Sequence, residues 1–327
     1  MQHTANFLLS AVRAAARATR FVHASTAIEG LDKADASPVT IADWSSQAVV
    51  ALLLARDPAW GSLPLVGEED ASSLRTDESR PLLDLVVGAV SHAIGPVEAD
   101  AVLDAIDRGR GEPGERFLTL DPVDGTKGFL RRQQYAISLG LIEAGRPVAG
   151  AVGCPNLALA EGRYDEADPA GSFAGAVLGE GAFLEVAPGE RRPMRIAAWS
   201  AGQPIRACES FESAHSRQDL SVELLAAVGA PGTPARLDSQ AKYVVVARGG
   251  ADIYMRLPVK PGYREKIWDH AAGALVASEA GARVTDVDGR PLDFGRGREL
   301  SANRGVFAGH PAIVDALVTA YAARVTA

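Results

Sequence analysis

The sequence predicts an α+β protein, in which helices and strands gather in different parts of the chain. Apolar residues recur at helical spacing through most of residues 5–106, and β-prone runs dominate residues 117–186. Alternation of helices and strands resumes after Leu220. A chain of 327 residues is long enough for one large domain or for two lobes that share an interface.

Two helices are expected at the N-terminal end. Residues 5–28 are rich in alanine and carry their larger apolar side chains at helical spacing. A second helix is expected over Ile41–Arg56, where Trp44 and Leu52 lie on one face. The segment 35–40 is turn-like and separates the two helices.

The next part of the chain is expected to hold one strand, a broken helical region and two loops. Leu63–Val66 is a short apolar strand candidate. Residues 81–106 have a helical pattern that is interrupted near Gly95-Pro96. The polar residues 70–80 and the glycine-rich residues 108–115 are expected to be loops.

The middle of the chain is expected to be mostly strands. Residues 117–120 form one strand candidate, and the β-rich runs 135–142 and 147–154 flank a hairpin signal at 143–146. Beyond Pro155 shorter strands are expected at 174–178, 182–186 and 195–198.

Two helices are expected near the C-terminal end. Trp268–Ala280 has a clear helical pattern, and Gly281 follows where a glycine cap belongs. Residues 311–323 form a last amphipathic helix. The change of pattern after Pro155 predicts two units, residues 1–158 and 159–327.

Composition excludes several classes of protein. The net charge is −8, from 33 basic and 41 acidic residues, which argues against a nucleic-acid scaffold. Cys154 and Cys208 are the only cysteines, too few for a disulfide framework or a four-thiolate zinc site, and small buried side chains are expected for both. There is no apolar leader and no apolar run of membrane-spanning length, so we expect a cytoplasmic protein that enters no membrane.

The stretch from Leu118 to Phe129 carries the most chemical information. Asp121 and Asp124 follow a β-prone run and are separated by a proline, which would present both carboxylates from a stiff loop at a strand end. Two anions held together repel each other unless a cation lies between them, and Mg²⁺ prefers oxygen ligands. These residues alone also allow an ordinary β-turn.

Further acidic positions also have two interpretations each. Thr40 and Asp43 have the spacing of a helix capping box, and Asp43 is equally compatible with a catalytic carboxylate. Glu68 and Glu69 follow a predicted strand and form either a solvated edge or part of a metal site. Asp269 stands at the start of a predicted helix, where a carboxylate also favours the helix dipole.

Three motifs, taken in this order, resemble the inositol monophosphatase superfamily of metal-dependent, lithium-sensitive phosphatases. They are Gly67-Glu68-Glu69, the Asp-Pro-Val-Asp-Gly-Thr run at 121–126, and the Trp-Asp-His-Ala-Ala-Gly run at 268–273. Further segments are similar to the branch that acts on 3′(2′),5′-bisphosphate nucleotides; they are residues 37–43, 121–130, 238–243, 256–260, 263–273 and 291–295. The resemblance spans roughly residues 5–310 but is weak at 70–80 and 187–218.

The resemblance implies a layered α-β-α-β-α sandwich in two lobes, with a site for two or three Mg²⁺ ions at their junction. The N-terminal lobe would carry most metal ligands, and the C-terminal lobe would carry Asp269 and the nucleotide contacts. By resemblance, the first ion is held by Glu68, Asp121 and the carbonyl of Val123, and the second by Asp121, Asp124 and Asp269.

The resemblance also implies a reaction, the hydrolysis of a phosphate ester by a metal-activated water. Asp43 would orient or deprotonate this water, with Thr126 as its hydrogen-bonding partner. Contacts to the substrate are implied for Gly125, Thr126, His215, Ser239, Lys242, Arg256 and Asp269. Lys242 and Arg256 would form a second anion site, since both lie in matching segments of an otherwise acidic chain, although ordinary surface charge is the alternative.

The expected partner is therefore a small phosphorylated nucleotide, and the expected assembly a monomer or homodimer. The nearest alternative is an inositol monophosphatase or a related sugar phosphatase with the same metal mechanism. A non-catalytic nucleotide- or metal-binding regulator on this fold is the alternative from another class. It is disfavoured because every matching acidic position is occupied.

Overall fold

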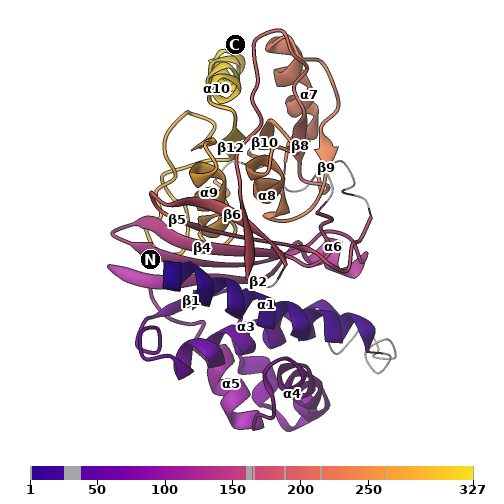
Figure 1. Ribbon diagram of the computed structural model, residues 1–327, viewed down its shortest axis with the longest axis vertical. Helices are drawn as coiled ribbons and strands as arrows, with labels where there is room; N and C mark the ends of the chain where they lie inside the picture. The colour runs from indigo at the N-terminus through magenta and orange to yellow at the C-terminus, as the bar shows by residue number, and fades with distance from the viewer. Residues whose placement is uncertain are drawn as a thin grey trace.

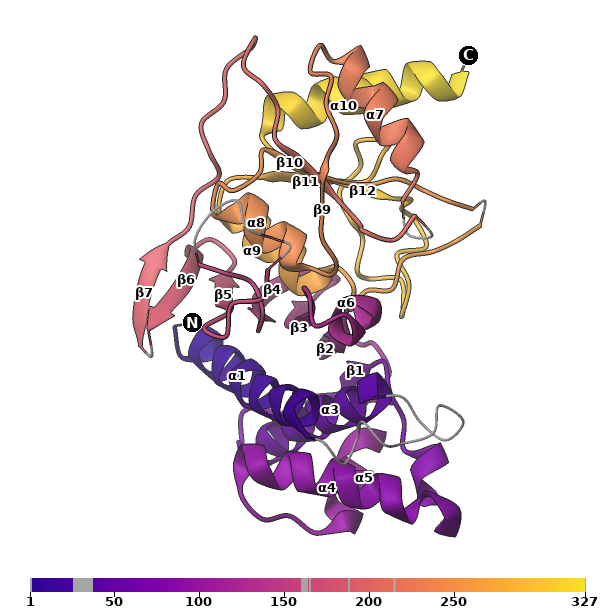
Figure 2. The same cartoon turned by 90° about the vertical axis from the view of Figure 1, so that its right-hand side faces the viewer.

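The structure is a stack of helical and sheet layers in the order α-β-α-β-α (Figure 1). It is a computed structural model that describes residues 2–25, 38–159, 164, 166–187, 189–213, 216–260 and 262–326. Figure 2 shows the middle helical layer lying between the two sheets.

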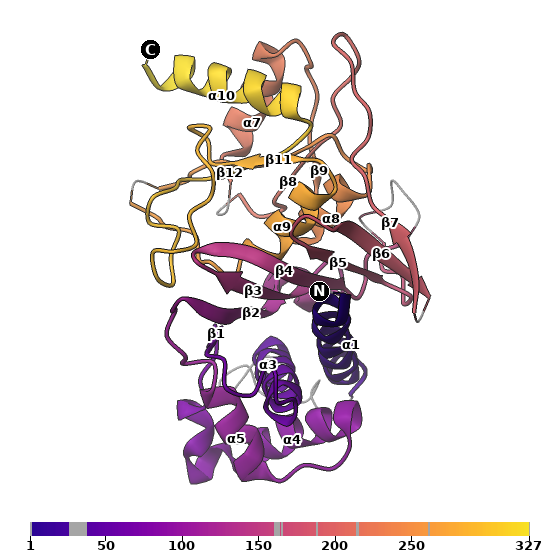
Figure 3. The same cartoon turned by 60° about the vertical axis from the view of Figure 1, so that its left-hand side comes forward.

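The first helical layer is built from the N-terminal helices. Helices α1 (Gln2–Ala24) and α3 (Pro38–Arg56) pack side by side on one face of the first sheet. Helices α4 (Arg80–Ile94) and α5 (Ala99–Asp107) cover α3 from the other side (Figure 3). Because α3 is enclosed on both sides, it is apolar nearly all round, and residues 41–51 are all buried.

The first sheet has seven strands in sequence order. The first two strands are parallel and all later neighbours are antiparallel. Its strands are β1 (Leu65–Gly67), β2 (Arg116–Asp124), β3 (Ala136–Glu143), β4 (Arg146–Cys154), β5 (Ser172–Val177), β6 (Gly181–Ala187) and β7 (Glu190–Pro193). Helices cover both of its faces, so its central strands are buried throughout.

The second half of the stack consists of a middle helical layer, a five-stranded sheet and an outer pair of helices. The middle layer is α8 (Ala241–Ala247) and α9 (Ala271–Glu279). The sheet has the order β11-β12-β10-β8-β9, with β8 (Ala207–Glu209), β9 (Ala235–Arg236), β10 (Ile253–Arg256), β11 (Arg283–Thr285) and β12 (Val306–Gly309). The outer pair is α7 (Gln218–Ala227) and α10 (Pro311–Thr326).

Most elements expected from the sequence are present, with a few corrections. The helix expected over 5–28 is α1, and residues 26–28 lie outside the described residues. The strand expected at 195–198 is absent, because these residues follow β7 as irregular chain, where the Ile196 N–H bonds to the carbonyl of Ala280. The loop expected at 70–80 contains two short 3₁₀ turns.

The chain passes from the first sheet to the second between β7 and β8. The predicted boundary between residues 158 and 159 falls between β4 and β5 of the first sheet, and the division into two lobes stays a prediction. Both cysteines are buried, as expected.

Within the described residues, no single helix is both long and apolar enough to cross a bilayer. One pair, Asp77–Ile94 and Ala99–Asp107, passes by length and composition but is bent by 88°.

Candidate active site

A polar cleft of about 310 Å³ lies where the end of β2 meets the start of α8 and the end of β10. Its lining combines carboxylates, hydroxyls and cations from segments far apart in the sequence. The lining residues are Glu68, Asp121, Val123, Asp124, Gly125, Thr126, Lys127, Ser210, Glu212, Asp238, Ser239, Lys242, Arg256, Tyr263 and Asp269.

An irregularity at the end of β2 presents the first two carboxylates. The strand was expected to stop before Asp121, but it continues to Asp124, with a register shift against β3 between these residues. A shift of this kind re-aims side chains, so that both carboxylates and Val123 line the same cleft. Gly125 then adopts a φ of +87°, and a Cβ there would lie 3.1 Å from the Cβ of Ser239. The glycine is required both by its backbone conformation and by this close approach.

Asp121 is the most enclosed carboxylate of the cleft. Its side chain is 2% exposed, and its Oδ1 atom has no hydrogen-bond partner among the described residues. Burial raises the pKa of Asp121 well above its usual range, and repulsion from Asp124 and Glu68 adds to the shift. A buried and unpartnered carboxylate oxygen is costly unless a cation binds it.

Glu68 reaches the cleft from the residue after β1. The side chain is open to water on one side, but its carboxylate lies among other acids. Partial burial and repulsion from Glu69 and Asp124 raise the pKa of Glu68 to about 7, while Lys266 opposes the shift.

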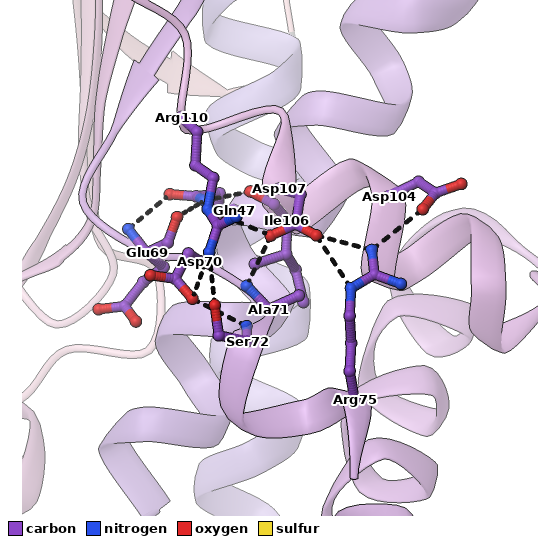
Figure 4. A network of polar contacts seen from close by, with 10 residues as sticks. All are labelled: Gln47, Glu69, Asp70, Ala71, Ser72, Arg75, Asp104, Ile106, Asp107 and Arg110. Carbon is purple, nitrogen blue, oxygen red and sulfur yellow. Dashed lines mark hydrogen bonds and ion pairs between the residues drawn. The ribbon is translucent and has the colours of Figure 1, made fainter.

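A buried side chain of α3, Gln47, fixes the position of this segment (Figure 4). Its amide nitrogen donates to the carbonyls of Glu69 and Ile106 at 2.6 and 2.7 Å, and its oxygen accepts the Glu69 N–H at 3.2 Å. Asp107 then accepts the N–H of Ala71 at 2.9 Å. The backbone beside Glu68 is therefore held to both α3 and α5.

Asp43 lies one helical turn before Gln47 on α3. The helix begins at Pro38, so Thr40 lies inside the helix rather than at its N-cap, and the capping interpretation is wrong. Burial raises the pKa of Asp43 well above its usual range, and the charges of Glu69 and Glu68 add to this.

Asp269 lines the same cleft, just before α9 and close to Arg256. The Arg256 Nη2 is 3.8 Å from Oδ2 of Asp269 but only 2.6 Å from Oε2 of Glu265. Burial raises the pKa of Asp269 to about 8. The Arg256 charge opposes this shift, and repulsion from Asp124 and Glu265 adds to it. His270, the next residue, is buried and hydrogen-bonds through Nδ1 to the hydroxyl of Tyr243 at 2.8 Å.

Lys242 and Ser239 reach the cleft at the start of α8. Lys242 is only 2% exposed, and its Nζ donates to the carbonyl of Leu237 at 3.1 Å. Burial lowers the pKa of Lys242, while Asp124 and Asp238 oppose this. Both Lys242 and Arg256 are therefore enclosed cations and not ordinary surface charges.

A model of the inositol monophosphatase family matches residues 8–323 of the chain. The chain belongs to this family. A curated Oryza sativa relative, named 3′(2′),5′-bisphosphate nucleotidase, is 41% identical over 327 residues, covering 95% of this chain and 91% of its own. A Schizosaccharomyces pombe relative of the same name is 40% identical over 333 residues, and the alignment covers 96% of this chain and 94% of the relative.

A solved structure has the same fold. The inositol monophosphatase from Anabaena (Nostoc) sp. PCC 7120 aligns with a TM-score of 0.63 at 18% identity, covering 99% of this chain and 96% of the other. At this identity the likeness concerns the fold alone. It confirms the predicted layered sandwich.

Family members are metal-dependent, and the acidic side of the cleft fits a divalent cation. Several carboxylates converge there, their pKa values are raised by burial and mutual repulsion, and one buried Asp121 oxygen lacks a protein partner. An all-oxygen donor set of this kind suits a hard cation such as Mg²⁺.

The structure brings most of the predicted site residues together in one cleft. Asp43 is not among the lining residues but lies near Glu68, as the influence of Glu68 on its pKa indicates. His215 lies outside the described residues. Sequence reasoning missed Gln47. It gave no role to Glu265, although this residue lies in the matching segment 263–273, because its partner Arg256 lies across a loop.

Proposed function

We propose that the protein is a Mg²⁺-dependent phosphomonoesterase that hydrolyses the 3′-phosphate of 3′-phosphoadenosine 5′-phosphate to give AMP and phosphate. The observation that carries the proposal is that one cleft is lined both by a cluster of carboxylates, its acidic side, and by two enclosed cations, Lys242 and Arg256, its cationic side. A substrate with two phosphate groups has one group for each side, and the name of the relatives at about 40% identity refers to such a substrate.

The metal would bind on the acidic side. Glu68, Asp121, Asp124 and Asp269, with the carbonyl of Val123, are the ligands we propose for two or three Mg²⁺ ions. When bound, the ions would neutralise charge on the phosphate and lower the pKa of water to supply a nucleophile. The surrounding protein contributes by fixing the carboxylates, since the β2 irregularity and the Gln47 contacts hold two of the segments that carry them.

Asp43 would accept the proton of the attacking water. Its buried position raises its pKa, which makes its carboxylate a stronger base than an exposed aspartate. Thr126, the first residue of helix α6 (Thr126–Leu130), lines the cleft, and its hydroxyl would hydrogen-bond to Asp43.

The 5′-phosphate would bind on the cationic side. Lys242 supplies a buried point charge, Arg256 supplies planar N–H donors, and Ser239 and His215 would supply further donors. Gly125 would contact the substrate through its backbone, because the space next to its Cα is filled by Ser239 and Asp238. We also propose that the protein is a cytoplasmic monomer or homodimer, which light scattering and cell fractionation can check.

Product analysis tests the proposed reaction. Purified protein is incubated with 3′-phosphoadenosine 5′-phosphate and Mg²⁺, and products are separated by ion-exchange chromatography. We expect AMP and free phosphate, and no turnover when a chelator removes the metal. Release of the 5′-phosphate instead, which yields 3′-AMP, would contradict the assignment of the two sides. Turnover of inositol 1-phosphate alone would favour an inositol or sugar phosphatase with the same metal site.

A further inference from the structure

A buried ion pair beside the cleft joins Arg256 to Glu265, a residue without a role in the proposed reaction. Arg256 Nε donates to Glu265 Oε1 at 2.9 Å, and its Nη2 lies 2.6 Å from Oε2. Two parallel contacts of this kind hold the guanidinium in one plane and orientation. Glu265 is 4% exposed, so the pair is shielded from water and from screening by salt.

The carboxylate of Glu265 is itself fixed from behind. Its Oε2 lies 3.4 Å from Nε2 of His270, whose Nδ1 is hydrogen-bonded to the hydroxyl of Tyr243. The backbone carbonyl of Glu265 accepts the N–H of Leu300 at 2.8 Å. Burial alone would raise the pKa of Glu265, but Arg256 and His270 outweigh it and lower the value to about 2, which keeps the carboxylate charged.

The same guanidinium also lies near a proposed metal ligand. Arg256 Nη2 is 2.6 Å from Oε2 of Glu265 and 3.8 Å from Oδ2 of Asp269, so of these two carboxylates only Glu265 is within hydrogen-bond distance of this nitrogen. Glu265, Asp269 and His270 have the mutual spacing of a metal site. In the described structure, however, the cation that pairs with Glu265 is the Arg256 guanidinium.

We propose that Glu265 is a positioning residue that holds the Arg256 guanidinium away from Asp269, which leaves Asp269 free to bind a cation and Arg256 free to face the anionic substrate. The inference rests on the proposed function, because it takes Asp269 as a metal ligand. Without the Glu265 charge, the nearest carboxylate for the buried guanidinium is Asp269. A guanidinium paired with Asp269 then competes with the metal for the same oxygens.

The test measures metal binding without substrate. Mg²⁺ is titrated by calorimetry into wild type, Glu265→Gln, Arg256→Gln and the double variant, and the Mg²⁺-induced rise in melting temperature is recorded for each. We expect Glu265→Gln to weaken Mg²⁺ binding by about 10- to 100-fold, the usual range for residues that orient metal ligands. Arg256→Gln should bind Mg²⁺ at least as tightly as wild type, and the double variant should match Arg256→Gln because no guanidinium remains to be held.

Glu299→Gln is the matched control. Glu299 is a half-buried glutamate that pairs at 2.7 Å with Lys266, the neighbour of Glu265 in the chain. This variant should bind Mg²⁺ like wild type.

The comparison in the Arg256→Gln background keeps the inference testable even if Glu265→Gln alone does not fold. If Glu265→Gln weakens Mg²⁺ binding about 10-fold there as well, Glu265 acts on the metal directly and the inference is wrong. Unchanged binding in folded Glu265→Gln also overturns it. Absence of Mg²⁺ binding in the wild type would instead refute the proposed function itself.

Discussion

Replacing Lys242 by methionine tests whether the cationic side of the cleft recognises the second phosphate. Lys242 is 2% exposed and lines the cleft, so its ammonium group would meet a bound phosphate with little competing water. Methionine has a similar length and keeps the apolar stem packed, which avoids the cavity that alanine would leave. The variant therefore removes the charge and the hydrogen bonds while it preserves most of the packing.

The expected loss follows from the charge and burial of this group. A hydrogen bond to a charged partner contributes about 1.5–3 kcal/mol. Since each 1.4 kcal/mol changes an equilibrium constant about tenfold, kcat/KM for 3′-phosphoadenosine 5′-phosphate should fall by about 10- to 150-fold, mainly through KM. For 3′-AMP, which has no 5′-phosphate, kcat/KM should change by less than about 3-fold, because the interaction is absent for this substrate.

The assay measures phosphate release from both substrates at saturating Mg²⁺. Lys260→Met is the control, because Lys260 is an exposed lysine in the segment after β10 and should have normal kinetics. Equal losses on both substrates would refute the assignment of Lys242 to the 5′-phosphate. They would show instead that Lys242 acts on the metal side or on the packing of α8.

Four further predictions concern the acidic side. Asp43→Asn should lower kcat by about 10²- to 10⁴-fold with little change in KM, measured in steady state, and unchanged kcat would remove Asp43 as the base. Asp121→Asn should raise the melting temperature of the metal-free protein, because it removes a buried carboxylate that its acidic neighbours repel. It should also abolish the rise in melting temperature that Mg²⁺ causes. A lower melting temperature of the metal-free variant would contradict this. Folding raises the pKa of Asp269 to about 8, so between about pH 4 and 8 the folded metal-free protein binds more protons than the unfolded chain. Its free energy of unfolding should therefore fall as the pH rises through this range, and the fall should disappear with Mg²⁺. Denaturation at several pH values measures this. Gln47→Leu leaves the Glu69 N–H and the carbonyls of Glu69 and Ile106 without their hydrogen-bond partner, so the free energy of unfolding measured in urea should fall by about 3–5 kcal/mol and Mg²⁺ binding should weaken. A fall below about 1 kcal/mol would show that the Gln47 hydrogen bonds contribute little.

The acidic part of the site could be predicted from the sequence because its motifs are local. The Asp-Pro-Val-Asp-Gly run of 121–125 places two carboxylates and a required glycine within five positions, and the structure keeps them in one cleft. What local reasoning misjudged was the backbone, since β2 continues through Asp124 with a register shift instead of ending in a loop. Pairing with β3 determines that shift, and the partner strand is not visible in the motif itself.

The supporting contacts could not be predicted because they join distant segments. Gln47 meets Glu69 through tertiary packing, and a glutamine inside an apolar helix gives no sign of its partner. Arg256 was expected in the cleft, but its bidentate pairing with Glu265 depends on the path of the intervening loop. The strand expected at 195–198 failed for a similar reason, since a β-prone run becomes a strand only where a sheet edge is within reach.

The most direct test of the proposed function compares kcat/KM for 3′-phosphoadenosine 5′-phosphate and inositol 1-phosphate, side by side, with Mg²⁺ and with chelator. A bisphosphate nucleotidase should strongly prefer the nucleotide, lose its activity with chelator, and lose the preference in Lys242→Met. Preference for inositol 1-phosphate would contradict the substrate assignment, and activity that persists in chelator would contradict the metal site.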